Sequence, residues 1–355
     1  MSRVGRVGRV VLLDGGMGRE LLNRGVPQEA GLWSATSVAR EQYHPEVVQL
    51  HLDFLRAGSR VLTTNNYACQ PTYYQAAFES GWEEKLLEHT AHAVRLCQEA
   101  VRQFCAEDGV PREEVTILGC LPPLIESHRP DLVVGLGESW LSSWYQRLAA
   151  QLLQGGVDGL LAETMNTMQE ARSAFDGAKA AAQSCGRREV PFWLALQGSL
   201  RCPETMRAQA QAAREMRIVE QLRDLAGDAD LKLEVFLLNC ARPREILAVL
   251  QALEKDLQNL QEDHGVKLGA YANLCEDSGQ EFLDADGESD RSRSPKKRLS
   301  KYDRRESRKF LGTHQRLEED FVDDTLAMIR LGCSYVGGCC GCPPQLIRKV
   351  AVQLE

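Results

Sequence analysis

The chain has 355 residues, of which 43% are hydrophobic, and this is enough to bury one large core. Its formal net charge of -8 argues against general nucleic-acid binding, which requires a basic surface, and no apolar run is long enough to cross a bilayer. The apolar run that follows the basic N-terminus, Val10 to Leu13, is too short for a signal peptide. We therefore expect a cytoplasmic protein whose twelve cysteines are free thiols or metal ligands rather than disulfides.

Short apolar runs alternate with amphipathic stretches along the chain, which is typical of a parallel sheet covered by helices on both faces. The expected strands are 10–14, 60–64, 115–119, 159–163, 192–197, 235–240, 268–273 and 334–338. The expected helices are 45–57, 83–105, 140–153, 167–181, 207–225, 244–260 and 321–331. Eight such units in a chain of this length predict an α/β fold, a single-domain (β/α)₈ TIM barrel over residues 1–355.

Residues 276–309 do not fit the barrel pattern, because they are first acidic and then basic, with few residues that can be buried. We predict a charged, disordered insertion between the seventh strand and the helix that follows it. A nuclear-import signal, a phosphorylation site and a lid over the barrel mouth are alternative interpretations of this segment.

Polar residues follow several of the expected strands. Functional residues of TIM barrels lie at the C-terminal ends of the strands, so these groups should converge on one mouth. They are Asp14-Gly15-Gly16, Thr63-Thr64-Asn65-Asn66-Tyr67, Glu163-Thr164, Asn239-Cys240 and Cys339-Cys340.

Cys339 and Cys340 are adjacent and flanked by glycines that permit a sharp turn. Neighbouring residues cannot easily form a disulfide with each other, but they can both bind one metal ion. The best distant third ligand is Cys240, and three protein ligands leave the open position of a catalytic zinc site. A local, closed structural site made of Cys333, Cys339, Cys340 and Cys342 is the alternative. Cys333 is expected on the far side of the barrel, so Cys342 is the nearer rival.

Several of these blocks together resemble the homocysteine S-methyltransferase family, and the match runs in order along nearly the whole chain. The family includes betaine-dependent, S-methylmethionine- or S-adenosylmethionine-dependent and cobalamin-dependent enzymes. The blocks are Asp14-Gly15-Gly16-Met17-Gly18, His51-Leu52-Asp53-Phe54-Leu55-Arg56-Ala57-Gly58, Thr63-Thr64-Asn65, Ala162-Glu163-Thr164, Asn239-Cys240 and Gly337-Gly338-Cys339-Cys340-Gly341.

The resemblance implies that Cys240, Cys339 and Cys340 hold Zn²⁺. It also implies that Asp14 and Glu163 receive the ammonium group of the substrate. The full set of predicted substrate residues is Asp14, Gly15, Trp33, Thr64, Tyr67 and Glu163. The chain departs from the family at residues 119–127, where many members carry a Gly-Pro-Tyr segment, and in the charged insertion.

A free thiol is mostly protonated at neutral pH, whereas a zinc-bound sulfur is held as the nucleophilic thiolate. We therefore expect the sulfur of homocysteine to attack the methyl group of a small, positively charged donor and to yield methionine. The chain ends directly after the eighth helix, so no segment is expected to bind cobalamin or folate or to form the dimer of the betaine enzyme. S-methylmethionine or S-adenosylmethionine is the expected donor, betaine the alternative, and a monomer or weak homo-oligomer the expected state.

Two other functions compatible with the sequence remain as alternatives. The acceptor could be selenocysteine or another thiol, and the protein could be a catalytically silent, zinc-binding regulatory barrel. The remaining cysteines are interpreted as ordinary buried residues, and His51 and His92 as helical residues rather than ligands. These cysteines are Cys69, Cys97, Cys105, Cys120, Cys185, Cys202 and Cys275.

Overall fold

The computed structural model describes residues 9–127, 129–133, 135–187, 189–198, 208–274 and 314–355. Its strands form one sheet in the order β1-β8-β7-β6-β5-β4-β3-β2, and all pairs are parallel. A parallel bridge between Leu13 and Val61 joins the two outermost strands and closes the barrel. The predicted TIM barrel is therefore confirmed. The strands are β1 (Val11–Leu12), β2 (Val61–Thr63), β3 (Thr116–Leu121), β4 (Gly159–Met165), β5 (Phe192–Gln197), β6 (Leu233–Asn239), β7 (Lys267–Ala272) and β8 (Cys333–Gly338).

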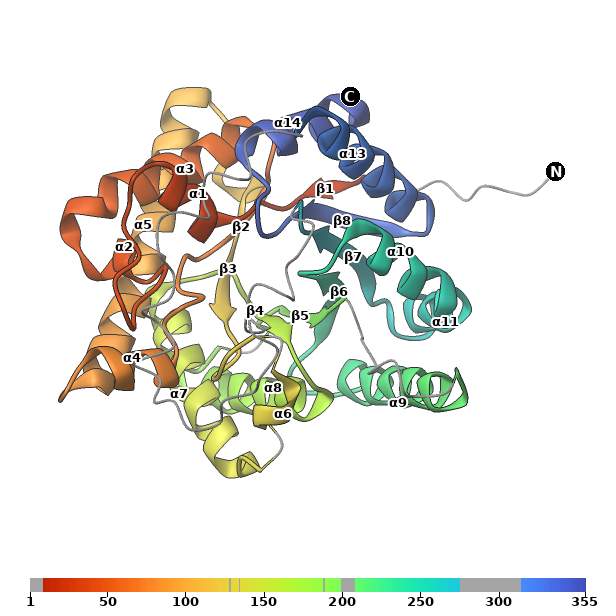
Figure 1. The fold of residues 1–355 in the computed structure, drawn as a ribbon. Helices are drawn as coiled ribbons and strands as arrows, with labels where there is room; N and C mark the ends of the chain where they lie inside the picture. The colour runs from red at the N-terminus through yellow and green to blue at the C-terminus, as the bar shows by residue number, and fades with distance from the viewer. Residues whose placement is uncertain (1–8, 128, 134, 188, 199–207, 275–313) are drawn as a thin grey trace, which may run out of the picture.

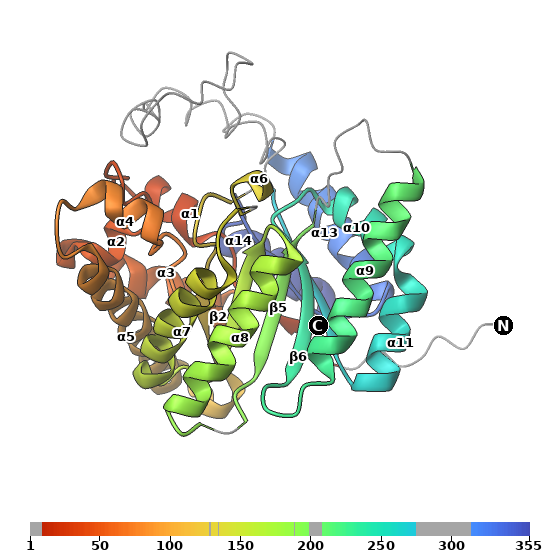
Figure 2. The ribbon, with the colours of Figure 1, turned by 90° about the horizontal axis from the view of Figure 1, so that it is seen from below.

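Helices surround the strands on the outside of the barrel, as the view along its axis shows (Figure 1). In the side view, α8 and α9 run alongside β5 and β6 (Figure 2). The helices are α1 (Met17–Asn23), α2 (Thr36–Ala39), α3 (His44–Arg56), α4 (Pro71–Ala77), α5 (Trp82–Asp108), α6 (Pro130–Val133), α7 (Glu138–Gly155), α8 (Met168–Ser184), α9 (Ala208–Ala226), α10 (Pro243–Ala252), α11 (Glu254–His264), α13 (His314–Arg330) and α14 (Pro344–Leu354), with 3₁₀ turns η1 (Glu41–Tyr43) and η2 (Arg112–Glu114).

The prediction of one continuous helix over 244–260 is wrong, because α10 ends and α11 begins at Leu253. Leu253 has φ -102° and ψ 5°, which interrupts the helical backbone, and its side chain is buried. Apolar residues continue at helical spacing across this break, so the periodicity of the sequence did not indicate it.

The strands are buried on both faces, and their side chains alternate between two cores. In β6, Phe236 and Leu238 pack outward against the helices, whereas Val235 and Leu237 point into the barrel. The core inside the barrel closes its lumen below the mouth. It consists of Leu13, Val61, Leu118, Leu161, Trp193, Ala195, Val235, Leu237 and Tyr271.

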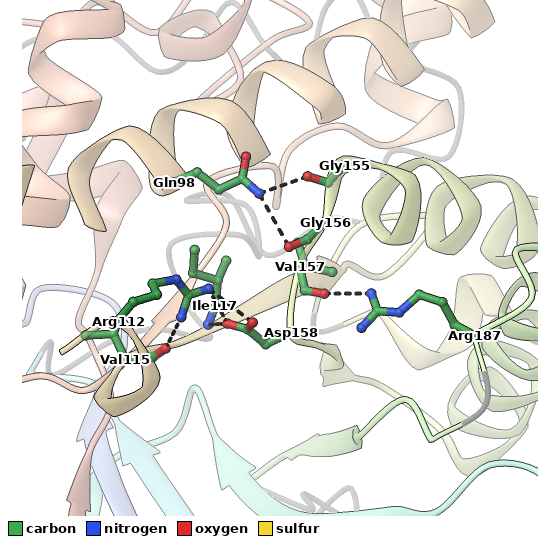
Figure 3. A network of polar contacts seen from close by, with 9 residues as sticks. All are labelled: Gln98, Arg112, Val115, Ile117, Gly155, Gly156, Val157, Asp158 and Arg187. Carbon is green, nitrogen blue, oxygen red and sulfur yellow. Dashed lines mark hydrogen bonds and ion pairs between the residues drawn. The ribbon is translucent and has the colours of Figure 1, made fainter. Parts of the chain in front are cut away.

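Polar contacts join the segment that precedes β3 to the segment that precedes β4 (Figure 3). Arg112 pairs with Asp158 at 2.9 Å, and the Asp158 carboxylate also accepts a hydrogen bond from the backbone of Ile117. Gln98 on α5 donates to the carbonyl of Gly155 at the end of α7. These contacts lie at the N-terminal ends of the strands, the face of a TIM barrel that contributes to stability rather than to catalysis.

Among the described residues, no helix combines the length and the apolar character that a bilayer span requires. The charged insertion predicted at 276–309 lies outside the described residues, so its disorder stays a prediction.

Candidate metal centre and substrate pocket

Three cysteine sulfurs meet at the C-terminal ends of β6 and β8. The sulfur atoms of Cys240, Cys339 and Cys340 all lie within 4.8 Å of one another. A zinc–sulfur bond of about 2.3 Å in a tetrahedral site places sulfurs about 3.8 Å apart, so the three groups fit one zinc ion with only small adjustments. Cys240 is buried, whereas Cys339 and Cys340 keep some exposure. In the described part of the chain, no other three His, Cys, Asp or Glu side chains form a comparable cluster.

Close backbone packing fixes the corner that carries Cys339 and Cys340. A Cβ atom on Gly16 would lie 2.5 Å from the carbonyl oxygen of Cys339, and one on Gly338 would lie 2.3 Å from Cβ of Cys342. Only a residue without a side chain fits either position. Of the flanking glycines, Gly341 adopts the left-handed conformation, with φ 78°. Gly338 is therefore needed for close approach, and Gly341 for the turn.

Cys240 also has a left-handed backbone, with φ 51°, which is costly for a residue with a side chain. The same conformation occurs at Thr164, with φ 57°, at the end of β4. The side-chain amide of Asn239 donates to the Thr164 hydroxyl at 2.7 Å and links the two strand ends. Strained residues that persist in this way cluster at functional sites, where the surrounding structure holds them.

Asn273 is a residue of this site that the sequence reasoning missed. It follows β7, which lies between β6 and β8, and it is almost fully buried. Its Nδ2 donates to Sγ of Cys240 at 3.7 Å, and its Oδ1 accepts from the backbone N–H of Cys340 at 2.9 Å. Asn273 thus connects cysteines from two strands that are not neighbours. Its place as the polar residue that ends an apolar run was the available signal.

The alternative site with four nearby cysteines is not formed. Cys333 begins β8, and Cys339 follows the end of the same strand, so the two are about 20 Å apart at the rise of an extended strand. The thiol of Cys342 is buried and donates to the carbonyl of Ala272 at 3.3 Å. Neither sulfur belongs to the cluster.

The three thiols influence one another strongly. The contact with Cys339 lowers the pKa of Cys240, but Cys340 and burial raise it, and the net shift is upward. The contacts with Cys240 and Cys340, together with burial, raise the pKa of Cys339. Neighbouring thiolates in a buried position repel one another, so a bound cation is what allows all three to ionise. The donor set therefore suits a thiolate-binding metal such as zinc.

Two carboxyl groups lie beside this cluster. Asp14 is buried after β1, and its Oδ2 accepts from the backbone N–H of Thr63 at 2.8 Å. Burial raises the pKa of Asp14 well above its usual value, and the nearby charge of Glu163 raises it further. Burial also raises the pKa of Glu163 to about 7, the hydrogen bond from Cys120 lowers it, and the charge of Cys340 raises it.

The sheet geometry explains how Glu163 reaches the mouth. Glu163 follows Leu161, whose side chain points into the barrel, by two residues and so points to the same side of β4, and the register with β5 shifts within the stretch from Ala162 to Met165. None of the groups that most affect the pKa values of Asp14 and Glu163 is a cationic side chain. Two carboxyl groups in this setting attract a cation from outside the protein, such as an ammonium group.

The other predicted substrate residues divide into two kinds. Tyr67 and Trp33 form an edge-to-face pair with ring centroids 6.3 Å apart, and the Tyr67 hydroxyl pairs with the Ser127 hydroxyl at 2.5 Å. Burial and the charge of Cys240 raise the pKa of Tyr67, which places this ring near the metal cluster. Thr64 and Gly15 instead make structural contacts. The Thr64 hydroxyl bonds Asn66 and the backbone of Cys120, and a Cβ atom on Gly15 would collide with the Cys342 carbonyl.

Comparisons with known proteins agree with one another. The family model described as homocysteine S-methyltransferase matches residues 11–354. Homocysteine S-methyltransferase 4 of Zea mays is 23% identical over 98% of this chain and 90% of its own length. Selenocysteine methyltransferase of Astragalus bisulcatus is 24% identical over 97% and 92%. The crystal structure of the metallated homocysteine methyltransferase MmuM from Escherichia coli has the same fold, with a TM-score of 0.65 at 19% identity over 98% and 96% of the two chains.

Proposed function

Because the chain belongs to the homocysteine S-methyltransferase family, we propose that it is a zinc-dependent enzyme that methylates homocysteine to methionine with S-methylmethionine or S-adenosylmethionine as donor. The observation that carries the proposal is the cluster of Cys240, Cys339 and Cys340 beside Asp14 and Glu163. The cluster offers soft ligands to a metal, and the two carboxyl groups offer negative charge to the amino end of an amino acid.

Each group of the site has a separate task in this proposal. Bound zinc would keep the acceptor sulfur as a thiolate at neutral pH. Cys240, Cys339 and Cys340 would hold the ion, and their three negative charges preserve the nucleophilicity of an added sulfur. Asp14 and Glu163 would bind the ammonium group and fix the orientation of the acceptor, and orientation of this kind contributes up to about 7–11 kcal/mol in the best cases.

The aromatic pair supports a positively charged donor. The rings of Trp33 and Tyr67 pack edge to face, and an aromatic face attracts a cation such as a sulfonium. Tyr67 is also close enough to Cys240 for the charge of the thiolate to affect its pKa, so a donor beside this ring would be near the acceptor sulfur. We also infer a cytoplasmic protein, since the described cysteines are free thiols.

The test is a donor screen with the purified, zinc-loaded protein. Homocysteine is combined separately with S-methylmethionine, S-adenosylmethionine and betaine, and methionine is followed over time. We expect turnover with one of the sulfonium donors. Turnover with betaine alone would reassign the donor, and no turnover with any donor, despite bound zinc, would favour a silent regulatory barrel.

Selenocysteine is a second candidate acceptor, favoured by the similarity to the selenocysteine methyltransferase of Astragalus bisulcatus. The same assay with selenocysteine in place of homocysteine gives kcat/KM for each acceptor. A higher kcat/KM for homocysteine than for selenocysteine supports the proposal, and a lower one reassigns the acceptor.

A further inference from the structure

Cys120 lies inside the barrel next to one of the acidic residues. It belongs to β3, where it pairs in register with Leu161 of β4, and Leu161 points into the lumen. Glu163 follows Leu161 by two residues and therefore lies on the same side of β4. The thiol of Cys120 is fully buried and donates to Oε2 of Glu163 at 3.2 Å.

The backbone of Cys120 is fixed on both sides. Its N–H donates to the hydroxyl of Thr64 at 2.9 Å, and its carbonyl accepts from the side-chain amide of Asn66 at 2.9 Å. Thr64 and Asn66 are in turn joined by a hydrogen bond of 2.6 Å. The thiol is therefore presented to Glu163 from a rigid support, as a positioning group requires.

Tyr271 and Tyr67 are further polar neighbours of Glu163, since burial and also the charge of Glu163 raise the pKa of both hydroxyls. Among the described residues, the Tyr271 hydroxyl has no partner in hydrogen-bonding geometry, and the Tyr67 hydroxyl is paired with Ser127. Burial and the charge of Glu163 raise the pKa of Cys120 well above its usual value. The sulfur therefore stays protonated and acts as a donor rather than as a second negative charge.

We propose that Cys120 is a positioning residue that holds Oε2 of Glu163, so that Oε1 faces the mouth and receives the ammonium group of the acceptor. In this way Cys120 makes the enzyme selective for thiols that carry an α-amino group. The inference rests on the proposed function, in which Glu163 binds that ammonium group. The inference also assigns a role to Cys120, which lies in the stretch 119–127 where the sequence of this chain departs from that of many family members.

The test compares two acceptors that differ only in the amino group, homocysteine and 4-mercaptobutanoate. Their Kd values for the zinc-loaded protein are measured by calorimetry, and their KM values with the donor that the screen identifies. Cys120→Ala should weaken homocysteine about tenfold and leave 4-mercaptobutanoate within about twofold, as expected for a lost hydrogen bond to a charged group. Cys120→Ser retains a donor and should restore most of the selectivity. Cys97→Ala removes a buried thiol from α5 and is the matched control, with no expected effect on either acceptor.

Three results would overturn the inference: equal weakening of both acceptors, no weakening of either, or a Cys120→Ser variant that behaves like Cys120→Ala. A Glu163→Gln background adds a second check, because Cys120→Ala should have no further effect on the acceptor ratio there. The calorimetric arm needs no turnover. A failed donor screen therefore counts against the proposed function, whereas an unchanged ratio of Kd values counts against the role of Cys120.

Discussion

His51 offers a quantitative test of the packing between the helical layer and the barrel. It lies on α3, is fully buried, and neither of its ring nitrogens has a hydrogen-bond partner among the described residues. Burial lowers its pKa from 6.5 to about 3, so the ring is neutral in the folded protein. The stability that depends on this neutral ring is present above pH 6.5 and is lost as the pH falls from there towards about 3.

Two effects of replacing His51 can be separated. At pH 5 the His51 ring is protonated in the unfolded chain but stays neutral in the folded protein. This difference lowers the free energy of unfolding by about 2 kcal/mol relative to neutral pH. The unpaired ring nitrogens cost roughly 1–3 kcal/mol each at any pH. His51→Leu removes both effects and should stabilise the protein by about 1–3 kcal/mol near pH 7.5, after some loss to imperfect packing. His51→Gln does not titrate but stays polar, so it should remove the pH effect without that gain.

The assay is urea unfolding followed by circular dichroism near pH 7.5 and pH 5, for wild type and both variants. Other groups titrate equally in all three proteins, so the difference between variants isolates His51. The wild type should lose about 2 kcal/mol more than either variant between the two pH values. Equal losses in all three proteins would refute the reasoning, and so would a His51→Leu variant that is less stable than wild type near pH 7.5.

Three further predictions concern the site. Cys339→Ser should abolish zinc retention, whereas the control variant Cys342→Ser should still retain zinc. The measurement is the amount of zinc per chain after dialysis, and equal retention by the two variants would contradict the ligand assignment. Gly16→Ala should lower zinc affinity by roughly tenfold or more, because its Cβ would lie 2.5 Å from the Cys339 carbonyl. Gly137→Ala, whose Cβ would meet no atom closer than 3.9 Å, is the control in the same chelator competition. KM for homocysteine should rise as the pH falls through about 7. Burial raises the pKa of Glu163 to about 7, and the protonated carboxyl no longer attracts an ammonium group. A KM that does not change with pH would argue against this contact.

The sequence predicted the strands well because each is a compact apolar run, and most of these runs end in a polar residue. The strand predicted at 192–197 coincides with β5, and the polar ends of the other runs indicated one shared mouth. Cys240 was chosen as the partner of Cys339 and Cys340 because it ends such a run, and the family resemblance implied the same three ligands. The break at Leu253 was not predictable, because the helical spacing of apolar residues continues through it.

Contacts that depend on strand register could not be predicted from the sequence. The bond from Cys120 to Glu163 requires both side chains to point inward from neighbouring strands, and the sequence left Cys120 as an ordinary buried residue. Asn273 was missed for the same reason, because its two partners belong to strands on either side of β7. Sequence patterns identify which residues end a strand, but register decides which of them touch.

The closure of the barrel has a consequence for how ligand binding can be detected. β1 has only two residues, and besides the bridge from Leu13 to Val61 this junction is joined by the carboxyl group of Asp14 through the Thr63 amide. The carboxyl group of Asp14, which is expected to bind the ammonium group of the substrate, thus also helps to join β1 to β2. Hydrogen exchange at the Thr63 amide should consequently slow when homocysteine is added. The exchange rate of this one backbone amide would therefore report whether the substrate is bound.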